Sequence, residues 1–461
     1  MAHCIIVGAG LSGLSLAWYL KKFSKNSIEV TILEGENRAG GKAWTDKKGG
    51  FLIEKGVNGV LDNKPSTIEL AKELGLSLLK SNDASRVRFV VRDGRLIKLP
   101  DSPASFLKSD VLSFSGKLRL FCEPFIKRHP EVLDESLASF AKRRLGEEAY
   151  NYLIDPMASG IYAGNPERLS LKACFPRVYE LEQKYGSLIK AMISLQREAR
   201  RKGEKKKASA GPGGVLTSFN SGMEELVEAL CDKLKENLYL NQEVQAIYYE
   251  SGLWKVETGG SKPYEGTHVV LALPAYKAKK IMKDFSKRLA KLFSFFEYPP
   301  IAVCAFSFKK DQVRDLNGFG FLCPNLEKRA ILGCLWDSSV FRYRAPEGYH
   351  LLRCLMGGMR NRHVLEKTDS QLLELSLSEL KSLIGIKAEP ELAKCYRWKR
   401  AIPQYHIGYD NLLFQIKEEL LKHKGLYIRC NWIGGVSLND CVLNSKRLAR
   451  FIVNGENLIR F

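Results

Sequence analysis

The residues near the start of the chain that could do chemistry are glycines, in the segment Gly8-Ala9-Gly10-Leu11-Ser12-Gly13. Gly8 permits a tight turn, Gly10 lets a pyrophosphate approach the backbone, and Gly13 lets a helix pack close to a strand. The N–H groups at the start of that helix would then face the phosphates. Glu34 follows 34 − 13 = 21 residues later, where a carboxylate accepts hydrogen bonds from ribose hydroxyls. This spacing predicts a dinucleotide-binding site.

A second pair of glycines, Gly40 and Gly41, lies in the segment Arg38-Ala39-Gly40-Gly41-Lys42. Adjacent glycines expose backbone N–H groups that can meet another part of a diphosphate, although alone they would indicate an ordinary turn. Beside the first motif they favour FAD over NAD, because an FAD-binding fold wraps an extended dinucleotide with several backbone loops.

The elements that must position these glycines form a strand–helix–strand unit. Residues 3–7 and 28–33 are short apolar runs typical of buried strands, and residues 14–23 carry a helical pattern. Such a unit needs a right-handed crossover and belongs to a parallel sheet covered by helices. The predicted fold class is therefore α/β, with a Rossmann-like nucleotide-binding domain.

The rest of the chain mixes strands and helices. Residues 86–91 and 96–99 alternate like strands, and Asp93-Gly94 between them predicts a hairpin turn. Residues 104–200 are expected to be mainly helical, with a helix face at 137–145 that ends at Gly146. The other expected elements are strands over 244–249, 254–258, 269–273 and 426–429, several strands within 301–359, and helices over 370–383 and from about Asn444.

Length and composition describe an ordinary globular protein. The 461 residues suggest about two or three domains. A hydrophobic fraction of 45% with 27% charged residues excludes intrinsic disorder, collagen-like repeats and disulfide miniproteins. No run of about 18 apolar residues predicts a transmembrane helix, and the first apolar run ends at Gly8, too soon for a signal peptide.

The cysteines and histidines predict neither a disulfide framework nor a metal site. The chain holds 11 cysteines and 7 histidines, without a Cys-x-x-Cys pair or the spacing of metal ligands. We expect reduced thiols, mostly buried as small apolar side chains, in a cytoplasmic protein.

Basic residues exceed acidic ones by 72 − 51 = 21, and part of the excess is concentrated in residues 197–207. This stretch has seven basic and two acidic residues, and loop-like composition follows it at 208–214. A solvated surface loop is the simplest interpretation, and a patch facing anionic lipid or an anionic substrate is the alternative. Nucleic-acid binding is not expected, because no aromatic residue interleaves with the basic ones.

Two long blocks are more specific than the glycine motifs. The first runs from Asp155 to Ser170 as DPMASGIYAGNPERLS and continues with Ala173-Cys174-Phe175-Pro176, and the second is Gly435-Val436-Ser437-Leu438-Asn439-Asp440-Cys441-Val442. With them the chain resembles, over nearly its whole length, the oxygen-dependent, FAD-containing protoporphyrinogen oxidases of the flavin amine oxidase superfamily.

The resemblance implies three domains. These are an FAD-binding domain from 1–85, 212–274 and 425–461, a β-rich substrate-binding domain from 86–100 and 275–424, and a helical, membrane-associating domain over 101–211. It also implies which residues contact FAD. They are Gly8, Ala9, Gly10, Leu11, Ser12, Gly13, Glu34, Gly35, Gly40, Gly41, Lys42, Gly56, Val57, Asn58, Gly59, Val244, Asn431, Val436, Ser437 and Leu438.

The implied reaction turns protoporphyrinogen IX into protoporphyrin IX in heme biosynthesis, by six-electron oxidation with O₂ and release of hydrogen peroxide. Arg88 matches the arginine that pairs with a propionate in relatives, although alone it would indicate a surface arginine on a strand. Leu322 and Phe341 resemble apolar walls of the substrate site and could equally be core residues. Gly160 resembles a glycine facing the substrate, and Asn58 is the candidate catalytic residue.

The family's helical domain also implies contact with a membrane surface. Val111, Phe114, Leu118, Phe121 and Phe125 recur at spacings of three and four, which predicts one apolar stripe on a helix. The pattern alone favours a core helix, whereas the resemblance favours a monotopic or peripheral protein on the inner face of the cell membrane. A homodimer is compatible with the sequence.

Other functions stay open at this point. Coproporphyrinogen III oxidation to coproporphyrin III is the nearest alternative, because that substrate differs mainly in having four propionates instead of two. An amine oxidase or a carotenoid desaturase could share the scaffold, although the block at 155–170 argues against both. A basic nucleic-acid-binding protein would leave the glycine motifs without a role.

Overall fold

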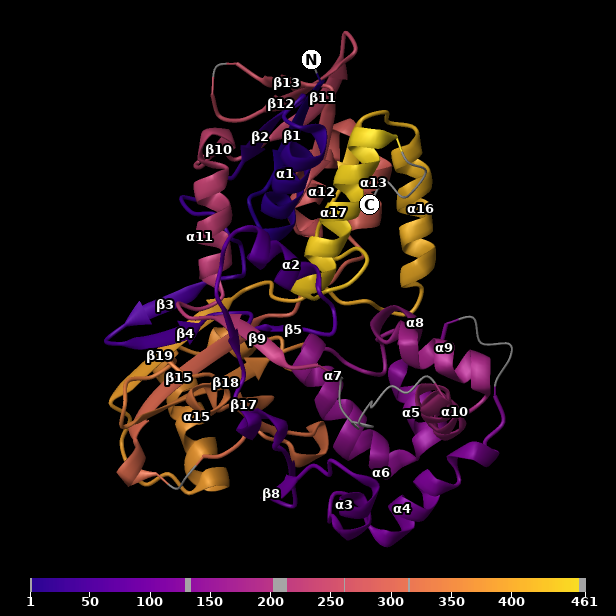
Figure 1. The fold of residues 1–461 in the computed structure, drawn as a ribbon, viewed down its shortest axis with the longest axis vertical. Helices are drawn as coiled ribbons and strands as arrows, with labels where there is room; N and C mark the ends of the chain where they lie inside the picture. The colour runs from indigo at the N-terminus through magenta and orange to yellow at the C-terminus, as the bar shows by residue number, and fades with distance from the viewer. Residues whose placement is uncertain (1, 129–133, 202–213, 261, 314–315, 456–461) are drawn as a thin grey trace. The chain divides into compact units, whose positions relative to one another are not determined.

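The computed structural model describes residues 2–128, 134–201, 214–260, 262–313 and 316–455 (Figure 1). The chain forms two compact units: Met1–Lys80, Gly214–Glu297 and Asp410–Phe461 make the first, and Ser81–Gly213 and Tyr298–Tyr409 the second. The predicted surface loop over 197–207 is helical at 197–201, where α10 (Leu188–Arg201) ends, so this part of the prediction was wrong. Residues 202–207 and the loop-like segment at 208–213 lie outside the described residues. The division into three domains stays a prediction.

A five-stranded parallel sheet is the centre of the first unit. Its strands lie in the order β10-β2-β1-β14-β20. The strands at its centre are continuous apolar runs, as expected of a sheet buried on both faces. The predicted α/β class and Rossmann-like unit are confirmed. The strands are β1 (Ala2–Val7), β2 (Ile28–Leu33), β10 (Leu238–Tyr239), β14 (His268–Leu271) and β20 (Leu426–Ile428).

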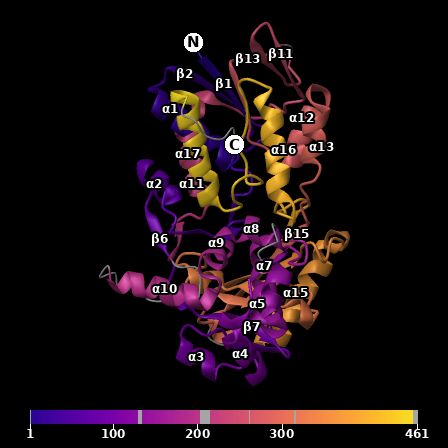
Figure 2. The same ribbon diagram turned by 90° about the vertical axis from the view of Figure 1, so that its right-hand side faces the viewer.

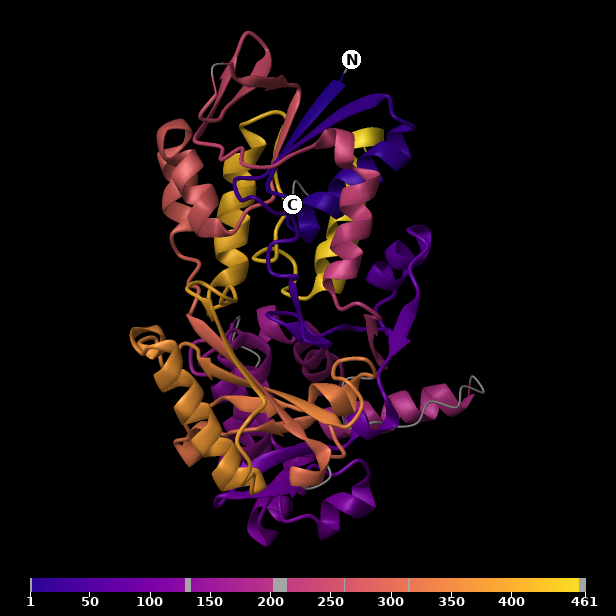
Figure 3. The same cartoon turned by 90° about the vertical axis from the view of Figure 1, so that its left-hand side faces the viewer.

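Helices cover both faces of this sheet (Figures 2 and 3). On one face α1 (Leu11–Ser24), α11 (Glu224–Lys233) and α17 (Leu438–Asn454) bury their apolar sides together with β1. On the other lie α12 (Ala275–Phe285), α13 (Lys287–Phe293) and α16 (Tyr409–Leu421). The smaller elements are β3 (Thr45–Lys48), β4 (Phe51–Glu54), β5 (Val60–Leu61), α2 (Ser66–Glu73), β6 (Leu78–Lys80), β9 (Leu216–Phe219), η4 (Lys235–Asn237), β11 (Ala246–Glu250), β12 (Leu253–Glu257) and β13 (Tyr264–Gly266).

The predicted start of the last helix, near Asn444, was wrong. Helix α17 begins at Leu438, six residues earlier. Ser437 is the cap, because its side-chain oxygen accepts a hydrogen bond from the Asp440 N–H at 3.2 Å. A serine in this position satisfies one of the free N–H groups of the first turn.

A seven-stranded sheet organises the second unit, in the order β19-β15-β18-β17-β16-β7-β8. Neighbours are antiparallel except for β16 and β7, which run parallel. The Asp93-Gly94 hairpin between β7 and β8 is confirmed, and both residues have positive φ, at 50° and 71°. The strands are β7 (Arg88–Arg92), β8 (Arg95–Lys98), β15 (Ile301–Lys309), β16 (Gly320–Leu322), β17 (Gly333–Leu335), β18 (Tyr349–Gly357) and β19 (Leu392–Trp398).

The helices of the second unit fall mainly before residue 201, as predicted. Helix α15, Asp369–Ile384, instead packs on the sheet. The others are η1 (Asp83–Arg86), α3 (Pro103–Lys108), α4 (Phe114–Phe121), η2 (Glu123–Phe125), α5 (Leu137–Leu145), α6 (Glu147–Ala149), η3 (Tyr150–Ile154), α7 (Asp155–Tyr162), α8 (Leu171–Cys174), α9 (Pro176–Tyr185), α10 (Leu188–Arg201), η5 (Lys310–Gln312), η6 (Asn325–Glu327), α14 (Asp337–Val340) and η7 (Val364–Glu366).

The apolar stripe from Val111 to Phe125 does not lie on a single helix, so this prediction was wrong. Helix α4 covers only Phe114–Phe121, Val111 precedes it, and Phe125 belongs to the separate turn η2. Pro124 lacks an N–H group and cannot continue the α-helical hydrogen bonds. No helix within the described residues is long and apolar enough to cross a membrane.

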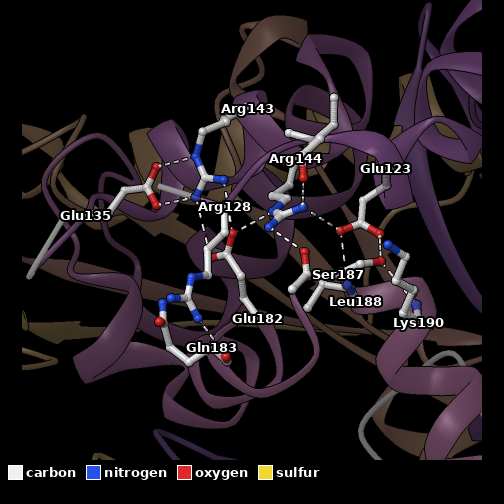
Figure 4. Close-up of polar contacts among 12 residues, drawn as sticks. Glu123, Arg128, Glu135, Arg143, Arg144, Glu182, Gln183, Ser187, Leu188 and Lys190 are labelled. Atoms are coloured by element: carbon white, nitrogen blue, oxygen red, sulfur yellow. Dashed lines mark hydrogen bonds and ion pairs between the residues drawn. The ribbon is translucent and has the colours of Figure 1, made fainter. Parts of the chain in front are cut away.

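A buried group of charges holds the helical segment together (Figure 4). Arg144 is fully buried, and its Nε lies 2.6 Å from Oε1 of Glu182 while its Nη1 lies 3.3 Å from Oε1 of Glu123. Glu123 also accepts a hydrogen bond from the Leu188 N–H at 3.0 Å. The carboxylate of Glu123 therefore fastens η2 to the start of α10.

Replacing Arg144 by methionine should destabilise the second unit strongly. The change leaves the buried carboxylates of Glu123 and Glu182 without this cation, which costs roughly 3–5 kcal/mol of unfolding free energy. Chemical denaturation would measure it. Arg177→Gln is the matched control, because the Arg177–Glu180 pair is exposed and should contribute less than about 1 kcal/mol. Equal effects of the two variants would contradict this interpretation.

Candidate cofactor and substrate sites

The cofactor residues of the first unit gather at the carboxyl edge of its parallel sheet. Gly8 follows β1, and its N–H donates to the Leu33 carbonyl of β2 at 2.7 Å. Ala272 follows β14 and donates to the Val7 carbonyl at 2.8 Å. This edge is where open parallel sheets bind their ligands. Segments that follow β1, β2, β14 and β20 therefore meet where a dinucleotide is expected.

The turn at Gly8 and the close packing at Gly13 agree with the prediction from the sequence, and the role of Gly10 at a pyrophosphate stays a prediction. Gly8 has φ of +107°, and a Cβ on Gly13 would lie only 2.0 Å from the Gly8 carbonyl oxygen, so α1 packs directly on the end of β1. A Cβ on Gly10 would meet nothing within 4 Å. No side chain caps the start of α1. The open space at Gly10 and the uncapped N–H groups fit a pyrophosphate.

The second glycine pair lies against the first motif. The Gly40 N–H donates to the Ala9 carbonyl at 2.8 Å, and a Cβ on Gly41 would lie 3.4 Å from the Gly10 Cα. Lys42 comes next, and burial lowers the pKa of its ammonium group to about 8. The two glycine loops thus lie against each other, and Lys42 directly follows the second loop.

Glu34, the predicted ribose contact, lies directly after β2. Its side-chain oxygens accept hydrogen bonds from the Ala9 N–H at 2.8 Å and the Glu36 N–H at 3.1 Å. A carboxylate has about four acceptor positions, so both oxygens keep capacity for hydroxyl donors. A Cβ on Gly35 would lie 3.2 Å from the Glu243 Cα, which places the chain leading to Val244 beside this segment.

Val244 is buried, but it is not part of a strand. Strand β11 begins at Ala246, two residues later than the predicted strand. The backbone of 241–244 instead runs beside Glu34, since the Gln242 N–H donates to the Glu34 carbonyl at 2.7 Å. The predicted contact between Val244 and the adenine stays a prediction.

The C-terminal segment approaches the same edge. Ser445 of α17 donates a hydrogen bond to the Ser12 carbonyl of α1 at 2.9 Å. Lys446 lies over the Tyr19 ring and Arg450 over the Phe23 ring, so the two helices run in the same direction. Their positive N-terminal ends therefore point to the same side. Val436, Ser437 and Leu438 precede this contact, and the start of α17 lies beside β5, since the Asn439 Nδ2 donates to the Leu61 carbonyl at 2.9 Å. Their contacts with FAD stay predictions.

The remaining cofactor candidates sit in loops of the first unit. Asn431 follows β20, and its Oδ1 lies 3.6 Å from the Cys430 Sγ. Gly56, Val57, Asn58 and Gly59 connect β4 to β5. A Cβ on Gly56 would lie 2.4 Å from the Lys42 carbonyl oxygen, so this loop passes closely against the second glycine pair. The roles of these residues, including catalysis by Asn58, stay predictions.

Three of the four predicted substrate residues lie together in the second unit. Arg88 of β7 pairs with Gly320 of β16, and Val90 pairs with Leu322, so Arg88 and Leu322 share one face of the sheet. A Cβ on Gly160 would lie 3.0 Å from the Leu322 Cδ2, which brings α7 to the same place.

The contacts of Asp155 position helix α7, and with it Gly160, beside Leu322. One carboxylate oxygen of Asp155 lies 2.5 Å from Nη1 of Arg360, and the other accepts a hydrogen bond from the Asn325 N–H at 2.9 Å. These contacts fix the start of α7 against the loop that follows β16. The aspartate therefore positions the sequence block that begins with it.

Arg88 is a half-buried cation without an acidic partner. Among the residues that the structure describes, no carboxylate pairs with it and its Nε has no hydrogen-bond partner. Burial lowers the pKa of its guanidinium, which lies over the Phe319 ring at 5.2 Å. The sequence reasoning missed Phe319, because its proximity depends on pairing between strands far apart in the chain. Arg88 can receive an anionic ligand.

Phe341, the fourth candidate, is fully buried and lies beneath the guanidinium of Arg344 at 5.1 Å from the ring centre. Its expected place as a wall of the substrate site stays a prediction. Within the described residues, His, Cys, Asp and Glu side chains form no group that could hold a metal ion.

Comparison with known proteins gives the family. The family of flavin containing amine oxidoreductases matches residues 11–453. The chain belongs to this family. It is 30% identical over 460 residues to a coproporphyrinogen III oxidase of Bacillus subtilis, covering 96% of each chain. It is 33% identical over 469 residues to a chloroplastic protoporphyrinogen oxidase of Nicotiana tabacum, covering 97% of this chain and 84% of the relative.

The fold agrees with these relatives. A crystal structure from an Exiguobacterium species, proposed to be a protoporphyrinogen oxidase, superposes with a TM-score of 0.85 at 25% identity and covers 99% of both chains. The family is flavin-containing, and the open cradle at Gly10, the paired glycine loops and Glu34 fit FAD. The enzyme is therefore an FAD-dependent oxidoreductase, as the sequence predicted.

Replacing Gly10 by alanine should separate folding from cofactor binding. The new methyl group meets no protein atom, so the midpoint of thermal unfolding of the apoprotein should stay within about 2 °C. It would occupy the space that the pyrophosphate needs, so bound flavin, read from absorbance near 450 nm, should fall by roughly tenfold or more. Gly259→Ala is the control, because its methyl group would make only an ordinary contact of 3.7 Å with the Gln245 Nε2. Full flavin content in the Gly10 variant would refute the placement of the diphosphate.

Proposed function

We propose that this enzyme oxidises protoporphyrinogen IX to protoporphyrin IX, with O₂ as electron acceptor and hydrogen peroxide as the second product, in heme biosynthesis. The names of relatives such as the Nicotiana tabacum protein support this reaction. The observation that carries the proposal is the unpaired, half-buried Arg88 on the same sheet face as Leu322 and beside Gly160. A flat apolar macrocycle with propionate groups needs both a cation and an apolar surface.

In this proposal the residues of the protein bind the porphyrinogen and orient it. The guanidinium of Arg88 can hold a propionate with two parallel hydrogen bonds, which a lysine cannot reproduce. Leu322 offers apolar surface, and Gly160 lets the backbone come close to a ring. When bound, FAD supplies the acceptor of two electrons that no side chain provides. Asn58 could then hold a pyrrole N–H by hydrogen bonding, and this is the role that we propose for it.

Coproporphyrinogen III is the second candidate substrate. The Bacillus subtilis relative is named a coproporphyrinogen III oxidase and matches over nearly the full length of both chains. Its name supports a substrate with four propionates instead of two. Purified enzyme given each porphyrinogen, with product fluorescence as the readout, separates the two reactions. Inactivity on both would favour an amine oxidase or a carotenoid desaturase.

Replacing Arg88 by leucine should raise KM for the porphyrinogen more than it lowers kcat. A hydrogen-bonded charge contact contributes about 1.5–3 kcal/mol, which corresponds to roughly 10- to 100-fold in KM. Arg88→Lys should show an intermediate value. Arg95→Leu, on the neighbouring strand β8 and exposed, should leave both constants unchanged. An unchanged KM in Arg88→Leu would remove Arg88 from the substrate site.

We also propose that the helical segment 101–211 associates with the inner face of the cell membrane. Phe114 and Phe125 are each 84% exposed, and Leu118 and Phe121 are exposed as well, whereas Val111 is buried. Aromatic rings exposed to this extent gain free energy when they enter the headgroup region. Lys127, which is exposed, could meet anionic headgroups, whereas the Lys117 ammonium donates to the Leu107 carbonyl at 3.0 Å. Arg119 serves the fold instead, since its guanidinium donates to the Arg143 and Arg144 carbonyls.

Replacing Phe114 and Phe125 together by serine should release the enzyme from membranes. Each buried phenylalanine contributes about 1.5–3 kcal/mol, so binding should weaken by at least about tenfold. Cosedimentation with vesicles that contain phosphatidylglycerol measures the bound fraction. Phe414→Ser, at a side chain 60% exposed on α16, is the matched control. If both variants bind to vesicles as the parent enzyme does, Phe114 and Phe125 are not the membrane contact.

A further inference from the structure

Four cysteines form a straight row across the sheet of the second unit. In the register of neighbouring strands, Cys395 of β19 faces Cys304 of β15, Cys304 faces Cys354 of β18, and Cys354 faces Cys334 of β17. Directly opposed residues in antiparallel strands project from the same face. All 11 cysteines of the chain are free thiols. The row is a feature of strand pairing that the spacing of cysteines in the sequence does not reveal.

One end of the row reaches the edge of the sheet. Strand β19 is the edge strand of the sheet (Figure 1). Cys395 is partly exposed there. Cys304, Cys354 and Cys334 are fully buried beneath α15, in the apolar cluster that includes Leu372. Small oxidants therefore approach the row from the side of Cys395.

The outer two thiols touch each other. The Sγ atoms of Cys304 and Cys395 are 3.9 Å apart and share a hydrogen bond. This bond lowers the pKa of the Cys304 thiol and raises that of the Cys395 thiol, because one proton is held between the two sulfurs. Opposed Cα atoms in antiparallel strands are roughly 4.5–5.5 Å apart, within the range that a disulfide spans.

We propose that Cys304 and Cys395 are a redox-active dithiol, oxidised by hydrogen peroxide to a disulfide that joins β19 to β15. One sulfur attacks the peroxide, forming a sulfenic acid and releasing one water. The other sulfur attacks the sulfenic sulfur, and the hydroxyl leaves with the second thiol proton as another water. In total two thiols lose two electrons and one peroxide becomes two waters. Only the idea that the enzyme makes this peroxide itself rests on the proposed function.

Peptide mapping of the flavin-loaded, full-length enzyme tests the proposal, because each of the four cysteines lies on a different tryptic peptide. Cys395 falls in 395–397, Cys304 in 292–309, Cys354 in 354–360 and Cys334 in 330–342. After treatment with added peroxide and blocking of remaining thiols, a species joining 395–397 to 292–309 should become the major form of both peptides. It should disappear with dithiothreitol.

Variants make the result specific. Cys395→Ser should abolish the linked species, whereas Cys231→Ser, a partly exposed cysteine on α11, should leave it unchanged. An unchanged circular dichroism spectrum and unfolding midpoint show that each variant is folded, and Cys304→Ser serves if Cys395→Ser does not fold. Absence of the linked species at peroxide levels that oxidise the exposed Cys122 would overturn the proposal. So would a link between Cys304 and Cys354 instead.

A second experiment distinguishes oxidation of the dithiol from production of the peroxide by the enzyme itself. Turnover with porphyrinogen in air should form the same disulfide, and catalase should prevent it. If added peroxide forms the disulfide and turnover does not, the dithiol site is supported and the result counts against peroxide production by the enzyme.

Discussion

The direct contact between the first turn of α1 and the end of β1 is the constraint on which the cofactor site depends. It exists only because position 13 has no side chain, since a Cβ there would overlap the Gly8 carbonyl. From this fixed point the other parts follow by hydrogen bonding. The Ala9 carbonyl accepts a hydrogen bond from the Gly40 N–H, and the Ala9 N–H donates to the Glu34 carboxylate. The Ser12 carbonyl accepts a hydrogen bond from the Ser445 hydroxyl. A shift of α1 would therefore disturb its contacts with three separate segments of the chain at once, those of Glu34, Gly40 and Ser445.

Two arginines of the second unit that are withdrawn from water differ in whether an acidic side chain pairs with them. Arg144 is surrounded by Glu123, Glu182 and a backbone carbonyl of Gly186, so its charge is satisfied within the fold. Arg88 is also withdrawn from water but has no carboxylate beside it among the described residues. Holding an unpaired charge in a partly buried place costs free energy that a bound anion would recover. This contrast, more than the residue type, distinguishes a binding arginine from a structural one.

Features with a local cause could be predicted from the sequence. The glycine turn, the strand–helix–strand unit and the Asp93-Gly94 hairpin depend on backbone conformations that neighbouring residues dictate. The cap at Ser437 determines the start of α17, six residues before the predicted start near Asn444. The spacing from Val111 to Phe125 predicts one helix because it continues across the break at Pro124.

Other features could not be derived from local sequence at all. Arg88 meets Phe319, and four cysteines align, only because strands distant in sequence pair in a particular register. A shift of one residue in any of these pairings would turn the side chains to the opposite face. Register of this kind depends on packing of the whole sheet, which a single sequence does not display. The substrate residues were placed by resemblance and not by such reasoning.

The pairing of α1 with α17 joins segments that are far apart in the chain, since Ser12 and the Ser445 that donates to its carbonyl are 433 residues apart. A ribosome makes the glycine turn long before it makes α17. The face of α1 that packs against α17 therefore stays uncovered in the nascent chain until α17 has been synthesised.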